Sequence, residues 1–264
     1  MTDIGDFLSG PDNQRIAFRR VQGEGPTVVW LGGFHSDMTG TKAQVLADRA
    51  QAGGWAYLRF DYFGHGASDG AFEAGTISRW REDALAVIDQ LTDGPLVLVG
   101  SSMGGWLALL LARELGRRGE TDRLQGVVLI APAVDMTEEL MLKGFSSRQL
   151  KALKETGRVD RPSQYSAEPY PVTNGLIEDG RRHLLFGRGI DVGAPVTILQ
   201  GGRDKDVPRE HAMRLVQHLL VDPVTITLVP DGDHRLSRPE DLDLLKASVT
   251  RALEVPPEQL ALEI

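Results

Sequence analysis

The stretch VGSSMGGWLAL, residues 99–109, decides the fold because two adjacent serines interrupt an apolar run. Residues 96–99 (LVLV) have the pattern of a buried strand, and residues 105–115 (GWLALLLAREL) have the pattern of a helix. Residues 100–104 read Gly-x-Ser-x-Gly. This is the sequence pattern of the nucleophile elbow, a sharp strand-to-helix turn that presents a nucleophilic serine. The positions two before and two after that serine must be small. Ser102 has glycine at both positions and is the predicted nucleophile, whereas Ser101 would have Val99 and Met103 there.

Apolar runs and helical patterns alternate along the rest of the chain. The predicted strands are residues 27–31, 55–60, 96–99, 127–130, 196–199 and 225–229, and the predicted helices are 42–52, 78–92, 102–117, 209–220 and 239–254. Several strands are apolar on both faces, which is typical of a parallel sheet covered on both sides. The pattern predicts an α/β fold with a mostly parallel, doubly wound sheet. Residues 14–23 are expected to form an antiparallel edge hairpin.

The alternation lapses between Val134 and Val192. Helical patterns at 137–155 and 176–185 are separated there by a loop that contains Pro162, Pro169 and Pro171. The segment is too long for a simple crossover, so we expect a helical cap at 134–192 on a core made of 1–133 and 193–264. The alternative is a surface excursion without a function.

Composition narrows the class of protein. The chain has 264 residues, 41% hydrophobic and 25% charged, a net charge of −8 and no cluster of Lys and Arg. This balance predicts a globular protein that binds neither nucleic acid nor an anionic membrane. Residues 96–112 contain two serines and three glycines, so no membrane span is expected. The absence of cysteine excludes disulfides and thiol catalysis and, with no signal-peptide pattern, favours a cytoplasmic location.

A serine nucleophile needs a histidine base that a carboxylate orients. In this kind of fold the acid and then the histidine follow the serine along the chain. His234 lies in a polar loop after the last predicted strand and is the expected base. The other histidines precede the serine, fall in a predicted helix or lie in the predicted cap: His35, His65, His211, His218 and His183.

The acid is expected at the end of the preceding strand, in residues 201–208 (GGRDKDVP). Asp204 lies early in that turn and is favoured. Asp206 is closer to the next helix and suits the role of a capping residue. Asp231 and Asp233 flank His234 and are expected to form turns.

Acyl transfer also requires two backbone N–H groups that stabilise the oxyanion. The residue after the nucleophile, Met103, supplies one at the start of a helix. Phe34, which follows Gly32 and Gly33 after the first core strand, is expected to supply the other, with Gly33 as the alternative.

Four segments resemble an α/β-hydrolase: residues 100–106 (GSSMGGW), 59–68 (RFDYFGHGAS), 201–208 and 233–235 (DHR). Residues 40–43 (GTKA), 78–91, 100–107 and 162–166 (PSQYS) are similar to one branch of that family. The branch contains mitochondrial acyl-protein thioesterases that also act on acyl glucuronides, together with bacterial hydrolases. The resemblance covers residues 25–253 and implies a Ser102–Asp204–His234 triad. Many relatives have His-Gly where this chain has Gly32-Gly33, but a backbone donor should survive that change.

The expected activity is hydrolysis of a small-molecule ester or thioester through an acyl-enzyme on Ser102, without cofactor or metal. A carbon–carbon bond hydrolase or perhydrolase with the same triad, and a non-catalytic ligand receptor, are the alternatives. Apolar residues of the cap and of the helix after Ser102 are expected to line an acyl pocket, and the alternative is that the cap face only packs on the core. The predicted substrate contacts are Trp106, Met141 and Phe145.

Overall fold

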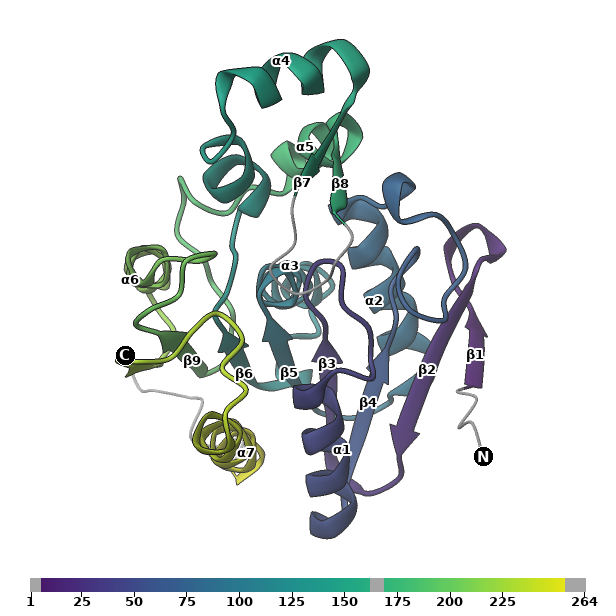
Figure 1. The fold of residues 1–264 in the computed structure, drawn as a ribbon. Coiled ribbons are helices and arrows are strands. Elements are labelled where there is room, and N and C mark those ends of the chain that lie inside the picture. Colours follow the sequence, from purple (N-terminus) through teal and green to yellow (C-terminus); the bar gives the residue numbers. More distant parts are fainter. Residues whose placement is uncertain (1–5, 162–168, 255–264) are drawn as a thin grey trace.

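The computed structural model describes residues 6–161 and 169–254. Within these ranges the main sheet has eight strands in the order β1–β2–β4–β3–β5–β6–β9–β10 (Figure 1). β2 pairs antiparallel with β1 and β4, and the other pairs are parallel, so the predicted fold class is confirmed. The strands are β1 (Asp6–Ser9), β2 (Arg15–Val21), β3 (Glu24–Leu31), β4 (Trp55–Phe60), β5 (Leu96–Ser101), β6 (Leu124–Ile130), β9 (Val196–Gly201) and β10 (Val224–Val229).

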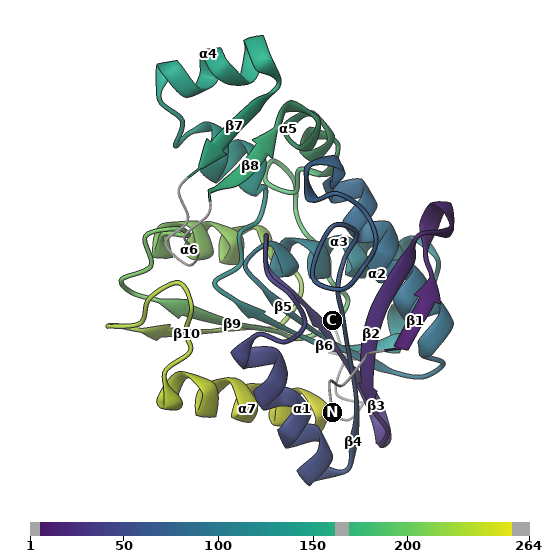
Figure 2. The ribbon, with the colours of Figure 1, turned by 45° about the vertical axis from the view of Figure 1, so that its right-hand side comes forward.

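Helices cover both faces of this sheet. Figure 2 shows α1 (Thr41–Gly53) and α7 (Pro239–Glu254) below it, and α2 (Ile77–Leu91), α3 (Met103–Arg117) and α6 (Arg209–His218) above it. Successive residues of β5 point to opposite faces of the sheet. Val97 packs with α1 and α7, whereas Leu98 packs with the helices on the other face. No described helix is both long and apolar enough to cross a membrane.

The antiparallel edge differs from the predicted hairpin. Residues 14–23 contain the single strand β2, and its hairpin partner is the preceding β1. The chain reverses at residues 10–14, where Asp12 and Asn13 both have a φ of 55°. Asp and Asn tolerate this left-handed conformation, which allows a short turn there. The prediction was therefore wrong about the position of the reversal and right about the antiparallel edge.

Several short elements lie between β6 and β9, beyond the carboxyl ends of the parallel strands (Figure 1). They are the short helix η4 (Thr137–Leu142), α4 (Ser147–Thr156), the paired strands β7 (Arg158–Arg161) and β8 (Tyr170–Thr173), α5 (Asn174–Gly180) and η5 (Arg181–His183). The β7–β8 pair was not predicted because strands of four residues are too short to show a period. Pro171 lies in β8, whereas Pro162 and the PSQYS segment lie outside the described residues.

Candidate active site

Ser102 occupies the turn between β5 and α3 in a strained conformation, with a φ of 54° and a ψ of −116°. Both flanking glycines are required by close packing. A Cβ on Gly100 would lie 2.3 Å from the carbonyl oxygen of Gly104, and a Cβ on Gly104 would lie 2.0 Å from the carbonyl oxygen of Leu31. Strained backbone at a serine that the surrounding chain holds in place is typical of functional sites.

The structure brings the three predicted side chains together. His234, in the loop between β10 and α7, has its Nε2 3.1 Å from Ser102 Oγ across 132 residues of sequence. Its Nδ1 lies 2.8 Å from Asp204 Oδ2. These distances allow an Asp–His–Ser hydrogen-bond chain in which Nδ1 carries the proton and Nε2 accepts from the serine.

Asp204 is held rigidly after β9. Its side chain is fully buried, and Oδ1 accepts hydrogen bonds from the backbone N–H groups of Asp206 and Val207 at 2.9 and 2.8 Å. Gln200 Nε2 lies 3.3 Å from Oδ2. These bonds fix the orientation of the Asp204 carboxylate, so that Oδ2 faces His234.

The other acidic candidates have different positions. Asp206 is not the N-cap residue of α6, because Pro208 occupies that position. The expected capping role of Asp206 is therefore wrong. Asp231 forms an ion pair with Arg238, and Asp233 accepts backbone N–H bonds within its own turn, as expected of loop aspartates.

The two expected oxyanion donors lie near the nucleophile. Met103 is the first residue of α3, where an N–H group has no partner inside the helix. Gly33, next to Phe34, approaches so closely that a Cβ built on it would lie 3.5 Å from Ser102 Cβ. The backbone N–H groups of Phe34 and Met103 make no hydrogen bond within the described part of the chain.

Two cavities meet at Ser102 and His234. We call the first the Lys42 cavity; its volume is about 230 Å³, and it is lined by Trp30, Gly33, Ser36, Asp37, Gly40, Thr41, Lys42, Ser101, Arg235 and Ser237. We call the second the Met141 cavity; its volume is about 350 Å³, and it is lined by Ala133, Met136, Leu140, Met141, Gly144, Arg161, Tyr170, Lys205, Asp206 and Val207. Phe34 and His35 contribute to both cavities. A substrate with two arms can therefore straddle the serine.

The predicted substrate contacts have different positions. Met141 lines the Met141 cavity. Trp106 is fully buried, lines neither cavity and donates from Nε1 to the carbonyl of His183 at 3.2 Å. Phe145 is also buried away from both cavities, beneath the guanidinium of Arg161. Their apolar character fits packing of the core and cap, so the structure offers no substrate contact for either residue.

His35 was missed because chain order argued against histidines before the serine. It lines both cavities, and its backbone N–H lies 3.3 Å from His65 Nε2. Burial lowers the pKa of His65 to about 4, so its ring is neutral and accepts this bond. His65 thus holds the backbone next to Phe34, a role that only the folded loops reveal.

Within the described ranges, Asp204, Asp206 and His234 are the group with ligand atoms close enough to hold a metal ion. The bonds already described occupy the buried Asp204 carboxylate and both ring nitrogens of His234. This arrangement fits an acid–base pair better than a metal centre.

Residues 25–171 match the family model Hydrolase_4, described as serine aminopeptidase, S33. A curated relative is the mitochondrial palmitoyl-protein thioesterase ABHD10 of Bos taurus, 36% identical over 90% of this chain and 76% of its own length. The human protein of the same name is 34% identical over the same shares. A putative hydrolase from Agrobacterium vitis S4 has a solved structure with a TM-score of 0.91 and 47% identity, over 95% of this chain and 98% of its own. The mouse α/β hydrolase domain-containing protein 10 gives a TM-score of 0.84 at 29% identity, over 94% and 97% of the two chains.

Proposed function

Because the chain belongs to the Hydrolase_4 family of α/β-hydrolases, we propose that Ser102, His234 and Asp204 form its catalytic triad. The chain is a hydrolase of esters or thioesters, in agreement with curated relatives named thioesterases. The observation that carries the assignment is the hydrogen-bond chain from Asp204 through His234 to Ser102, at the junction of two cavities.

Each member of the triad has a definite step. His234 Nε2 takes the proton of Ser102 as Oγ attacks the acyl carbonyl, and the charged ring is stabilised by Asp204. The N–H groups of Phe34 and Met103 stabilise the negative oxygen of the tetrahedral intermediate. When the intermediate collapses, His234 gives its proton to the leaving group, which departs, and the acyl group stays on Oγ. His234 then deprotonates a water molecule that attacks the acyl carbonyl, and it returns that proton to Ser102 Oγ as the acid is released.

Residues 134–192 act in this proposal as a cap on the core formed by 1–133 and 193–264. Met136, Leu140 and Met141 supply apolar walls of the Met141 cavity directly beside Ser102. An acyl chain placed there gains roughly 0.8 kcal/mol for each buried methylene, so two added carbons raise kcat/KM by about tenfold until the cavity is full. Flexible methionine side chains suit acyl chains of different shape.

The experiment is a substrate series of p-nitrophenyl esters and matched thioesters from acetyl to octanoyl. We expect kcat/KM to rise from acetate to at least butyrate. A steady fall of kcat/KM from acetate onward would contradict the acyl pocket, but it would not contradict the proposed triad. Labelling by a fluorophosphonate that depends on Ser102, together with turnover, distinguishes a hydrolase from a ligand receptor with the same fold.

The cellular location is a separate proposal. The sequence favours the cytoplasm, whereas the curated relatives are named mitochondrial proteins. Fractionation of the source cells with antibody detection tests the cytoplasmic prediction.

A further inference from the structure

Four arginines lie close to the place where α2 and α3 meet η5, the short helix that ends at the buried His183. We call Arg81, Arg113, Arg182 and Arg188 the arginine cluster. Two contacts fix its position: Ser78 Oγ on α2 lies 2.6 Å from His183 Nε2, and Trp106 Nε1 on α3 bonds to the His183 carbonyl.

The arginines extend from these anchor points. Arg81 follows Ser78 by three residues on α2, and Arg113 follows Trp106 by seven on α3, so each lies on the same helix face as its anchor. Arg182 is the neighbour of His183 in sequence. Burial lowers the pKa of Arg113, and Arg188 and Arg81 are close enough to lower it further. The four side chains therefore share one region of the surface.

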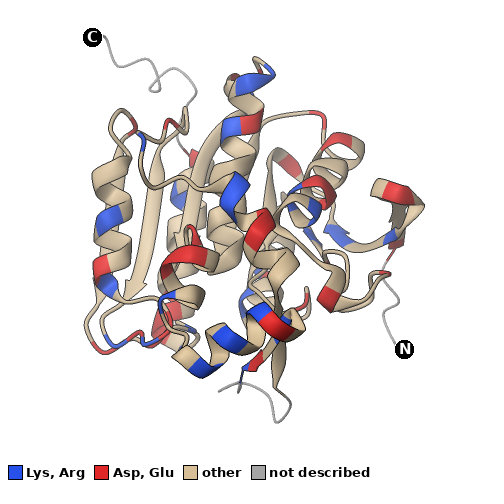
Figure 3. Ribbon diagram, turned by 90° about the horizontal axis from the view of Figure 1, so that it is seen from above, with Lys and Arg blue, Asp and Glu red and all other residues tan. Residues whose placement is uncertain are grey.

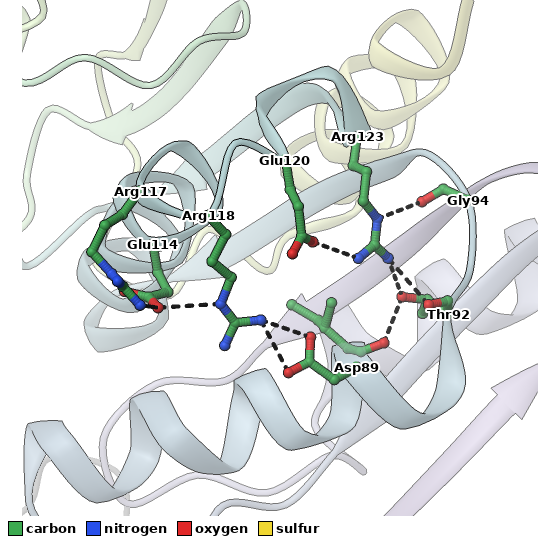
Figure 4. Close-up of polar contacts among 9 residues, drawn as sticks. Asp89, Thr92, Gly94, Glu114, Arg117, Arg118, Glu120 and Arg123 are labelled. Atoms are coloured by element: carbon green, nitrogen blue, oxygen red, sulfur yellow. Dashed lines mark hydrogen bonds and ion pairs between the residues drawn. The ribbon is translucent and has the colours of Figure 1, made fainter.

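Three of the four arginines have no direct ion pair with a described residue. Arg81, Arg113 and Arg188 make no ion pair and no side-chain hydrogen bond with any described residue, and the contact of Arg182 with Asp179 is 3.8 Å long. Arginines that are paired with carboxylates lie close by, at the end of α3. Figure 4 shows Arg117 and Arg118 there, both bonded to Glu114. Arg118 also bonds to Asp89 of α2.

The carboxylates near the arginine cluster accept hydrogen bonds from groups other than its arginines. Asp179 accepts two hydrogen bonds from Ser78, and Asp135 accepts the backbone N–H groups of residues 185 and 186. Within the described residues, the guanidinium nitrogen Arg81 Nε is a buried donor without a hydrogen-bond partner. Buried polar atoms nearly always have a partner, so unpaired ones point to a group that binds there.

We propose that the arginine cluster binds a phosphate group of a small ligand, at a site separate from both cavities beside Ser102. Guanidinium groups bind phosphate oxygens through paired hydrogen bonds, and several of them together offset the charge of a polyanion. Arg81 and Arg113 are half-buried and His183 is buried, so the region suits a compact anion better than a flat membrane surface. In a chain with a net charge of −8, mutual repulsion of four cations is otherwise an unexplained cost. Charges of both signs are interspersed over the rest of the molecule (Figure 3).

Calorimetric titration of the full chain with inorganic pyrophosphate, at constant ionic strength, tests this proposal. We expect saturable binding that persists after Ser102 is labelled by a fluorophosphonate. Arg81→Gln and Arg113→Gln should each weaken the affinity by about tenfold or more, the usual effect of a lost charge-assisted hydrogen bond. Arg117→Gln is the matched control, because this arginine lies on the same helix and already has a partner; it should retain the affinity.

Stability measurements make the test complete. Without pyrophosphate, Arg81→Gln and Arg113→Gln should unfold at the same temperature as the wild type or higher, because each removes a repulsive charge. Lower unfolding temperatures for both would give the arginines a structural role and overturn the proposal. Absence of saturable binding, or an equal loss in Arg117→Gln, would also overturn it. Binding to phosphatidylglycerol vesicles without binding of pyrophosphate would replace the small ligand by a membrane surface.

Discussion

The ammonium of Lys42 donates a hydrogen bond to the carbonyl oxygen of Arg235, although 193 residues separate them in the sequence. The N–O distance is 2.5 Å. This bond ties the start of α1 to the residue that follows His234, so it helps to hold the proposed base in place. Burial, followed by the charge of Arg235, lowers the pKa of Lys42 to about 8.

The lowered pKa of Lys42 predicts a pH dependence of stability. Between pH 8 and the ordinary lysine pKa of 10.5, the unfolded chain holds a proton that the folded chain has released. The unfolded state then binds more protons, so the free energy of unfolding rises with pH in this window. Relative to Lys42→Met, the wild type should gain stability between pH 8 and 10.5. Urea unfolding of both proteins at several pH values measures this difference, and a constant difference would contradict the prediction.

Replacement of Ser102 by Ala should abolish turnover and leave the unfolding temperature nearly unchanged. Ser101→Ala is the matched control, because Ser101 occupies the position of the turn that accepts different side chains. Steady-state kinetics with a p-nitrophenyl ester measures both. A reversed pair of phenotypes would show that the nucleophile has been assigned to the wrong serine.

Asp204→Asn should lower kcat by a factor on the order of 10⁴, a guide taken from the corresponding protease substitution. The amide would present a donor to His234 Nδ1 and favour the wrong tautomer. Asp206→Asn should cost far less, because Asp206 lies at the wall of the Met141 cavity and accepts no bond from His234. Comparison of kcat for the two variants tests the assignment; equal losses would leave the acid unidentified.

Gly104→Ala should destabilise the protein by several kcal/mol, because the added methyl would lie 2.0 Å from the backbone oxygen of Leu31. Backbone cannot move away as a flexible side chain can. Gly94→Ala provides the control, since a Cβ there meets no atom within 4 Å. Thermal unfolding of the two variants measures the contrast, and similar unfolding temperatures would argue against the tight elbow.

Local sterics explain why much of the site was predictable. The elbow needs glycine at two fixed positions, and this requirement alone distinguishes Ser102 from Ser101. Chain order and the predicted helices and cap then left His234, and an early place in the turn after the strand favoured Asp204. The structure brings these two residues together. Strand β4 (Trp55–Phe60) has the predicted bounds because all of its residues except Arg59 are apolar or aromatic and a glycine-containing loop follows it.

The remaining features depend on contacts between distant loops. The entry of His35 and Lys42 into the cavity at Ser102 depends on the path of the loop after β3. The burial of Trp106 depends on η5, which comes more than seventy residues later and packs over it. A single helix pattern shows that such residues are apolar or charged, but not which neighbour will cover them.

The order of the strands has a consequence for how the chain acquires activity. Asp204 and His234 follow β9 and β10, which lie at one end of the sheet and come last along the chain. Contacts across 132 residues form late, because closing a long loop costs entropy before any contact compensates. A chain folded only as far as β6 has the elbow serine but no base. If Ser102 and His234 act as proposed, the Ser102 hydroxyl therefore stays inactive during synthesis or refolding until the C-terminal strands have docked, and recovered turnover reports that final step.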